Sequence, residues 1–395
     1  MRANAKPIGG RLLTPSYKVI LLIAAIGVAT IIWRFAAGLG ATTALSDGYP
    51  WGLWIAFDVV VGTALACGGY AIAILLYVFN RGQYHPLIRP AILTSALGYS
   101  LAGLAVAIDV GRPWLLWKVP VMIWRWNVNS VLLEVAVCIM AYVVVLWIEL
   151  TPALLDRWSQ SGQEQLRRRA ERIRPSLDRA LIWITALGIL LPTMHQSSLG
   201  TLMLLSGPKL NAIWNTPFLP MLFLITSVCM GYAAVVFETT FSSLAFGLPK
   251  DLRILGSIQR VAAIGAAVVV GFRFVDLGLR GVMGQVFQLD LPAILFWIEN
   301  VLFVLPVLMV AQKRVVSLGS LFRSAVLLAL GGTLYRFDTF LVGFNPGRGW
   351  HYFPSVPEIL VSVGLVAVEL AAYIAIVKTF PILSGVRETS PTAVD

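Results

Sequence analysis

The sequence predicts an all-α, polytopic membrane protein with about ten transmembrane helices. Of its 395 residues, 58% are hydrophobic and only 12% are charged, with a mean hydropathy of +0.83. A soluble protein of this length would carry about twice that share of charge. The apolar residues fall in ten runs, each long enough to cross ~30 Å of hydrocarbon as a helix. We predict spans at 18–39, 53–79, 87–109, 128–153, 180–205, 217–245, 256–279, 289–312, 321–342 and 357–383.

Lysine and arginine are distributed unequally between the two ends of these spans. Of the 30 basic residues, 21 fall in the chain ends and the even-numbered loops, and six in the odd-numbered loops. Because cytoplasmic loops carry the excess of Lys and Arg, both termini are predicted to be cytoplasmic. Topology therefore accounts for the net charge of +11, and we expect no nucleic-acid partner.

The spans divide into two predicted four-helix bundles with one flanking helix at each end. We expect a cytoplasmic tail (1–18), helices one to five with the first bundle (19–205), helices six to nine as the second bundle (206–342), and helix ten with a cytoplasmic tail (343–395). The first bundle is the one that we expect to carry the functional site.

Two groups of loops have compositions that predict more than a simple turn. Residues 156–178 predict a charged, helical connector on the cytoplasmic side, facing anionic lipid. The outer loops 112–126 and 344–357 are rich in tryptophan and tyrosine. These aromatic residues predict either an interfacial belt or a docking surface, since aromatic residues and arginine are favoured in interface cores.

Ionisable side chains within the apolar spans are the strongest functional signal. Such groups are costly in hydrocarbon and usually have a partner or a task. The predicted orientation puts Asp58, Asp109, Glu134 and His195 in the outer half of spans two to five. This grouping suits a polar ligand that exchanges protons, so these four residues are the catalytic candidates.

Neighbouring polar residues complete the candidate site. Tyr99, Arg112 and Gln196 lie beside the four ionisable groups in sequence or depth. With His195, they are the candidate ligand contacts.

The fourth span carries a candidate proton path. Glu134, Cys138 and Tyr142 follow each other at intervals of four residues and share a helix face. Glu149 lies about 22 Å from Glu134 along the axis, toward the cytoplasm. We therefore predict a path through Glu134, Tyr142 and Glu149. The alternative is that each carboxylate bonds to a neighbouring helix.

In the second bundle, close spacing predicts ion pairs. Arg273 and Asp276 lie near the outer end of span seven, and Arg336 and Asp338 near that of span nine. Mutual pairing is the simplest account of these charges within lipid.

The cysteine and histidine counts restrict the cofactors. Three separated cysteines and no CxxC predict no iron–sulfur cluster in this chain, which would need about four thiolates. A bis-histidine haem needs two intramembrane histidines, and only His195 qualifies, because His85 and His351 lie in loops. We therefore predict no haem and no metal site.

Several long sequence blocks resemble the NrfD/polysulfide-reductase membrane-subunit family. They include PWGLWIAFD (50–58), ACGGYA (66–71), GYSLAGLAVAIDVGR (98–112), NVNSVLLE (127–134) and LPTMHQSSLG (191–200). Within that family, the chain looks most like the membrane subunit of periplasmic nickel–iron hydrogenases of the HybB type, and DsrP-type subunits of sulfite-reductase-linked complexes are similar too.

This resemblance implies a function as well as a fold. It implies ten helices, a non-covalent quinone site (menaquinone or ubiquinone) in the first bundle near the outer face, and an external multi-cluster, ferredoxin-like iron–sulfur subunit with its catalytic subunits. The family's carboxylates and histidine fall on Asp58, Asp109, Glu134 and His195. The expected location is a bacterial or archaeal cell membrane.

The leading prediction is a quinone-reactive membrane subunit that lacks the catalytic centre of its oxidoreductase complex. The partner would be a hydrogenase or a sulfur-metabolism enzyme. Two other functions stay open: a proton-coupled secondary transporter, which matched broken helices in the two halves would favour, and a purely structural membrane anchor.

Overall fold

The structure is a computed structural model that describes residues 5–249, 251–314 and 317–384. Parts of both predicted tails (1–4 and 385–395) and Lys250 of the basic sixth loop lie outside the described residues. In the described part, ten helices are long and apolar enough to span a membrane, and the chain forms only isolated bridges instead of β-strands. The prediction of an all-α polytopic membrane protein is confirmed.

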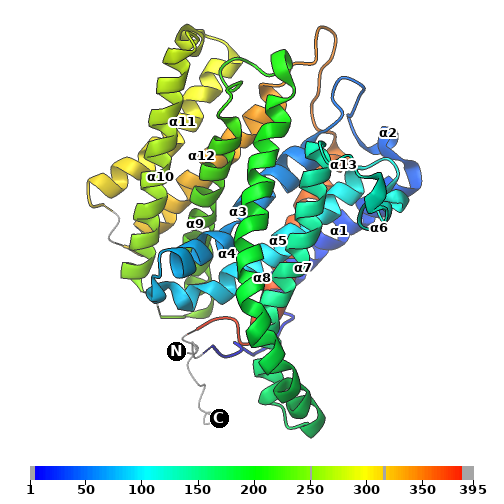
Figure 1. Cartoon of the computed structure of the whole chain (residues 1–395), viewed down its shortest axis with the longest axis vertical. Coiled ribbons are helices and arrows are strands. Elements are labelled where there is room, and N and C mark those ends of the chain that lie inside the picture. Colours follow the sequence, from blue (N-terminus) through cyan, green and yellow to red (C-terminus); the bar gives the residue numbers. More distant parts are fainter. Residues whose placement is uncertain (1–4, 250, 315–316, 385–395) are drawn as a thin grey trace.

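The observed helices agree closely with the predicted spans (Figure 1). The second span, Trp54–Val78, consists of several shorter segments. The nine others are α1 (Pro15–Ala37), α5 (His85–Asp109), α7 (Val131–Ser159), α8 (Glu164–Leu204), α9 (Leu219–Phe246), α10 (Leu252–Leu279), α11 (Leu291–Ala311), α12 (Leu318–Phe337) and α13 (Val356–Thr379).

The second span is distorted where it crosses the centre of the molecule. It begins as the π-helix η1 (Trp54–Val61), continues as α3 (Gly62–Leu65), turns, and resumes as α4 (Gly68–Ala73) and the π-helix η2 (Ile74–Val78). At the turn, α9 approaches so closely that a Cβ on Gly231 would lie 2.6 Å from the Cys67 carbonyl oxygen. Only glycine permits this crossing.

The helices pack in three groups. The second span, α5, α7 and α8 contact one another, α9 to α12 form a second group, and α1 pairs with α13. The two groups meet where α9 packs against α8 and the second span. In the α1–α13 pair, a Cβ on Gly27 would lie only 2.4 Å from Gly364 Cα, so small residues set the close approach.

The predicted connector at 156–178 is helical but is not a separate element. From Glu164 it continues without interruption into the fifth span, so that α8 is a single helix of 41 residues. Asp156 of α7 pairs with Arg174 of α8 at 2.5 Å and with Arg89 of α5 at 2.7 Å, so it links the first part of α8 to both helices. In Figure 1 this part projects beyond the body, on the face where both chain ends lie.

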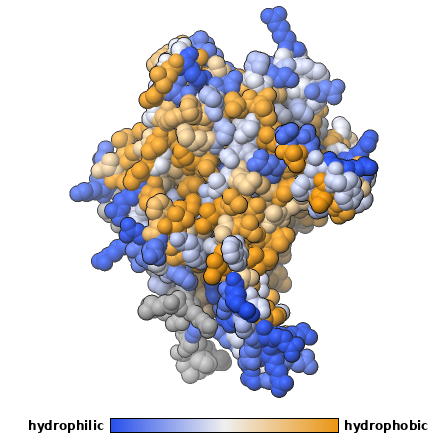
Figure 2. Space-filling view, viewed as in Figure 1, coloured by the Kyte–Doolittle hydropathy of each residue, from blue (hydrophilic) through white to orange (hydrophobic). Residues whose placement is uncertain are grey.

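The surface matches a membrane protein with one strongly basic end. Figure 2 shows apolar side chains over the middle of the molecule and polar ones on the projecting end of α8. Large apolar side chains such as Ile182, Trp183 and Leu187 are exposed on α8. In water such an apolar surface would be unstable, and lipid covers it in an integral membrane protein. We call the end that carries residues 156–178 the basic face.

Topology can be tested by labelling engineered cysteines, because the native Cys67, Cys138 and Cys229 are all buried. We expect a membrane-impermeant maleimide to label Val121→Cys in whole cells, and Gln165→Cys only after permeabilisation, since positive charge marks the cytoplasmic side. The opposite pattern would reverse the orientation.

Candidate functional site

His195 lies at the centre of the first bundle, completely enclosed by protein. It projects from α8 toward the second span, where its Nε2 lies 3.3 Å from Thr63 Oγ1. Gln196 Nε2 donates to the same hydroxyl at 3.1 Å and to the Tyr99 hydroxyl at 3.3 Å. Three helical spans thus contribute to one hydrogen-bonded group.

The hydrogen atoms of this group can be assigned by counting donors. The Thr63 hydroxyl donates its only hydrogen to the Val59 carbonyl at 2.6 Å, so its oxygen must accept from His195 and Gln196. Neutral His195 therefore carries its hydrogen on Nε2, and its Nδ1 is an acceptor. This Nδ1 and Gln196 Oε1 are buried without partners.

Each of these unpartnered acceptors carries a cost, because an unmade buried hydrogen bond costs about 1–3 kcal/mol. They match a ligand that presents hydroxyl hydrogens.

Tyrosines form the wall of the site toward α7. The Tyr99 and Tyr142 rings meet edge to face with centroids 4.6 Å apart, and Tyr99 lies 5.6 Å from the His195 ring. Cys67 Sγ lies 3.7 Å from the Tyr99 hydroxyl. Tyr99, Tyr142, His195 and Gln196 are therefore brought together, although they come from three spans.

The predicted carboxylates lie around this centre, not in it. Asp58 accepts a hydrogen bond of 2.6 Å from Ser362 of α13. Asp109, at the end of α5, has a buried unpartnered Oδ1 and interacts electrostatically with Arg34 of α1. Arg112 is exposed in the loop at 112–126, away from the enclosed histidine.

Glu134 and Glu149 both lie on α7 but differ in their surroundings. Glu134 is half-buried in the first turn, two helical turns outward of Tyr142, and no hydrogen bond joins it to His195 in the described structure. Glu149 packs against α8, since its Oε1 would lie 3.0 Å from a Cβ on Gly188.

Arg336 is the site residue that sequence reasoning assigned wrongly. The predicted pair with Asp338 does not form. Arg336 instead donates to the carbonyls of Phe223 at 2.7 Å and Val60 at 3.3 Å. Its guanidinium lies over the Phe223 ring at 4.6 Å and is fully buried. Residues two apart on a helix do not face each other, which explains the failure.

The other predicted pair, Arg273 with Asp276, is also wrong. Arg273 bonds Glu299 of α11 at 2.5 Å, and Trp214 donates to the same carboxylate at 3.2 Å. Asp276 pairs with Arg280 at 2.8 Å. The second bundle thus satisfies most of its buried charges by ion pairs between and along helices.

Few of the possible metal-ligating side chains in the described part of the chain lie close together. In the described residues, no three His, Cys, Asp or Glu side chains group as metal ligands. His85 begins α5 and His351 follows the ninth span, and both are exposed. The absence of haem and of iron–sulfur clusters remains a prediction.

Comparison with known proteins identifies the family. The family model "Polysulphide reductase, NrfD" matches residues 42–344. The chain belongs to the NrfD family. A probable Ni/Fe-hydrogenase 2 b-type cytochrome subunit of Escherichia coli is 40% identical, with 98% of this chain and 97% of the relative aligned.

Two further relatives are similar over different lengths. The integral membrane subunit of a menaquinone reductase from Nitratidesulfovibrio vulgaris is 34% identical over 42% of this chain and 37% of the relative. A selenate reductase subunit of Mesobacillus selenatarsenatis is 24% identical over 95% of this chain and 96% of the relative. Each of the three relatives is named as one subunit of an oxidoreductase.

The role of Arg336 can be tested by removing its charge. We expect Arg336→Met to lower the free energy of unfolding by about 2–4 kcal/mol, because two carbonyls in a lipid-embedded core lose their donor. Arg336→Lys should lose less, since one ammonium can still reach one carbonyl. Unfolding by detergent titration measures this; a wild-type midpoint for Arg336→Met would contradict the assignment.

Proposed function

We propose that this chain is the quinone-reactive membrane subunit of a respiratory oxidoreductase complex in a bacterial or archaeal cell membrane. The observation that carries the proposal is the pair of buried, unpartnered acceptors, His195 Nδ1 and Gln196 Oε1. The relatives support it, since one is named a menaquinone reductase subunit and another a hydrogenase subunit.

Quinone and quinol interconvert by two electrons and two protons, so the site must handle both. A quinol hydroxyl is the donor that both free acceptors require. His195 Nδ1 would accept the proton as the quinol is oxidised, and would return it when a quinone is reduced. The buried charge of Arg336, which interacts electrostatically with His195, favours negative charge on the quinone oxygens.

Proton exchange with this centre would use the surrounding tyrosines and carboxylates. Tyr99 and Tyr142 extend from the histidine toward α7, which carries Glu134 toward the outer face and Glu149 toward the basic face. Asp58 and Asp109 are the further candidates. Arg112 is too exposed to join this group, and we place it with the partner-facing loop.

The electrons would come from, or go to, an iron–sulfur partner at the outer face. The loop at 112–126 exposes Trp114, Trp117 and Trp124. Exposed tryptophans beside Arg112 and Arg125 suit a docking surface. The catalytic centre of the complex would lie beyond this partner.

The two alternative functions are less well supported. A secondary transporter of this type would have broken helices at matched positions in both halves. The second span is interrupted, but α9, the corresponding helix of the second bundle, is continuous from Leu219 to Phe246. A purely structural anchor does not explain buried acceptors without partners, which cost stability.

Quinol binding should depend on the central acceptors. We expect His195→Gln to weaken the binding of a short-chain naphthoquinol at least about tenfold, which corresponds to one lost hydrogen bond. Ser197→Ala is the matched control, because Ser197 lies on the same turn and donates only to its own helix. Quenching of tryptophan fluorescence in the purified protein measures binding.

In the intact complex, the same variant should lose quinone-linked turnover while the partner enzyme still reacts with a soluble viologen dye. Wild-type binding and turnover in His195→Gln would contradict the assignment of His195 to the quinol site. Failure of the wild type itself to bind the naphthoquinol would favour the structural anchor. Complex yield must be compared, because a buried substitution can impair assembly.

Haem content can be tested separately. We expect the purified chain to show no b-type band in a reduced-minus-oxidised spectrum, because a second intramembrane histidine is missing. A stoichiometric band that survives removal of the partner subunits would refute this, and would accord with the name of the Escherichia coli relative.

A further inference from the structure

A polar stripe runs along α13, the helix that sequence reasoning treated as a flanking element. Glu358, Ser362, Glu369 and Tyr373 lie within about 60° of one another around the helix axis. The stripe faces the second span, α5 and α9, because its side chains bond or contact residues of those elements. It extends from the outer end of the membrane span toward the basic face.

At the inner end of the stripe, Glu238 of α9 has a hydrogen-bond donor on each carboxylate oxygen. Tyr373 donates to Oε1 at 2.7 Å and Thr94 of α5 donates to Oε2 at 2.8 Å. Ser242 lies 3.3 Å from the Tyr373 hydroxyl. The Glu238 carboxylate on α9 is therefore bonded from α13 and from α5, and these hydrogen bonds fix its orientation.

The next carboxyl along the stripe is Glu369, one helical turn outward. Tyr373 lies four residues after it on α13. Glu369 Oε1 would lie 3.5 Å from a Cβ on Gly98, and Gly98 follows Thr94 by four residues on α5. Four residues along a helix rise about 6 Å, so Glu369 lies about one turn along α13 from the residue that bonds Glu238.

Asp58 follows two turns further outward, bonded to Ser362 at 2.6 Å. Glu369 interacts electrostatically with both Glu238 and Asp58. The interval from Glu369 to Ser362 is about 10 Å along α13.

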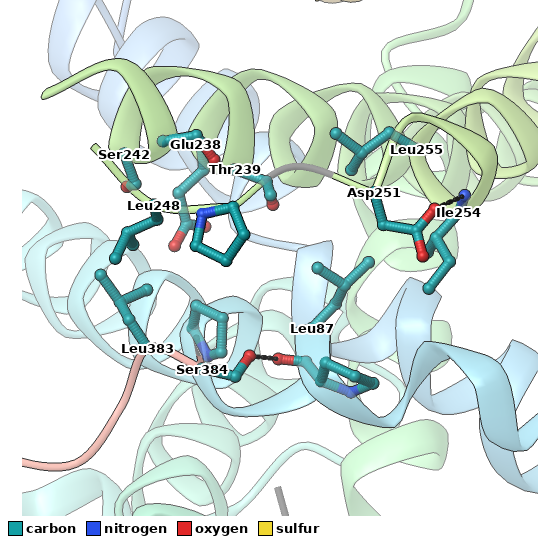
Figure 3. Close-up of a pocket in the computed structure, with 14 residues that line it drawn as sticks. Leu87, Glu238, Thr239, Ser242, Leu248, Asp251, Ile254, Leu255, Leu383 and Ser384 are labelled. Atoms are coloured by element: carbon teal, nitrogen blue, oxygen red, sulfur yellow. Dashed lines mark hydrogen bonds between the residues drawn. The ribbon is translucent and has the colours of Figure 1, made fainter. Parts of the chain in front are cut away.

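The inner end of the stripe opens into a cavity. A cavity of about 170 Å³ lies between the first turn of α5 and the end of α9, and Glu238 is one of its lining residues. Figure 3 shows Glu238 and Ser242 on one wall, with Leu87 on the opposite one. The cavity lies near the basic face, and its other lining residues include Leu248, Pro249, Asp251, Ile254, Leu255, Leu383 and Ser384.

We propose that this cavity is a proton entrance, and that protons pass from Glu238 through Glu369 to Asp58 and the quinone site. The proposal rests on the proposed function and adds a route that is distinct from Glu134, Tyr142 and Glu149 on α7. Each transfer moves one proton between carboxyl oxygens, and the two protons taken from the basic face accompany the two electrons that reduce the quinone.

The experiment uses the intact complex in liposomes with its partner subunits outward, so that the basic face meets the lumen. The lumen contains pyranine, the membrane contains a naphthoquinone, and external reduced viologen supplies electrons. In the wild type we expect quinone reduction, followed by its absorbance, with alkalinisation of the lumen. Glu369→Gln and Glu238→Gln should slow alkalinisation at least about tenfold while naphthoquinol binding stays unchanged.

Asp251→Asn is the matched control, because Asp251 lines the same cavity but bonds only the backbone of its own helix. It should behave as the wild type. Tyr373→Phe, which removes one donor from Glu238, should give a smaller loss and serves if a glutamine variant fails to assemble.

The outcomes separate the two proposals. If the wild type neither binds naphthoquinol nor reduces naphthoquinone, the proposed function fails. If it reduces naphthoquinone but Glu369→Gln and Glu238→Gln alkalinise the lumen normally, the route along α13 is wrong. Loss of alkalinisation in Glu149→Gln with normal Glu369→Gln would assign proton uptake to α7.

Discussion

The buried guanidinium of Arg336 is the constraint around which the centre of the molecule is organised. It has no carboxylate partner among the described residues, so its charge depends on the carbonyls of Val60 and Phe223 and on the Phe223 ring. Val60 belongs to the π-helical η1, and π-helical turns often occur at functional sites. The hydrogen bonds from Arg336 connect the second span to α9. They therefore help to position Thr63, three residues after Val60, next to His195.

Both bundles contain buried polar atoms without a hydrogen-bond partner. In the second, Arg273, Glu299 and Trp214 form a bonded group, but Glu299 Oε2 and both carboxylate oxygens of Asp338 lack a partner among the described residues. In the first, the hydrogen-bond network stops at two acceptors that lack donors. The acceptors of the first bundle belong to the uncharged side chains of His195 and Gln196, which suits an uncharged quinol, and we therefore propose the first bundle as the reactive half.

Hydropathy predicted the fold well because a membrane helix is recognised by length and apolar content, both of which are read along one dimension. Apolar content alone, however, could not predict how the site residues are arranged. Lipid-facing and core-facing sides are both apolar, so depth could be predicted for Glu134 and His195, but not the direction in which each side chain points. The resulting pairing of Glu134 with His195 has no hydrogen bond in the described structure. Long-range partners such as Ser362 for Asp58 also depend on packing that spacing cannot reveal.

Electrostatics links the site to its surroundings. If His195 takes a proton from a quinol, it becomes a second positive charge near Arg336, and both side chains are fully buried, so the repulsion is little screened. The proton is therefore held weakly and must move to a group that gains from it. Carboxylates are such groups, and they lie outward of the histidine on α7 and along the stripe of α13. The arrangement thus favours prompt proton departure over storage, which is what a site that couples electron and proton transfer requires.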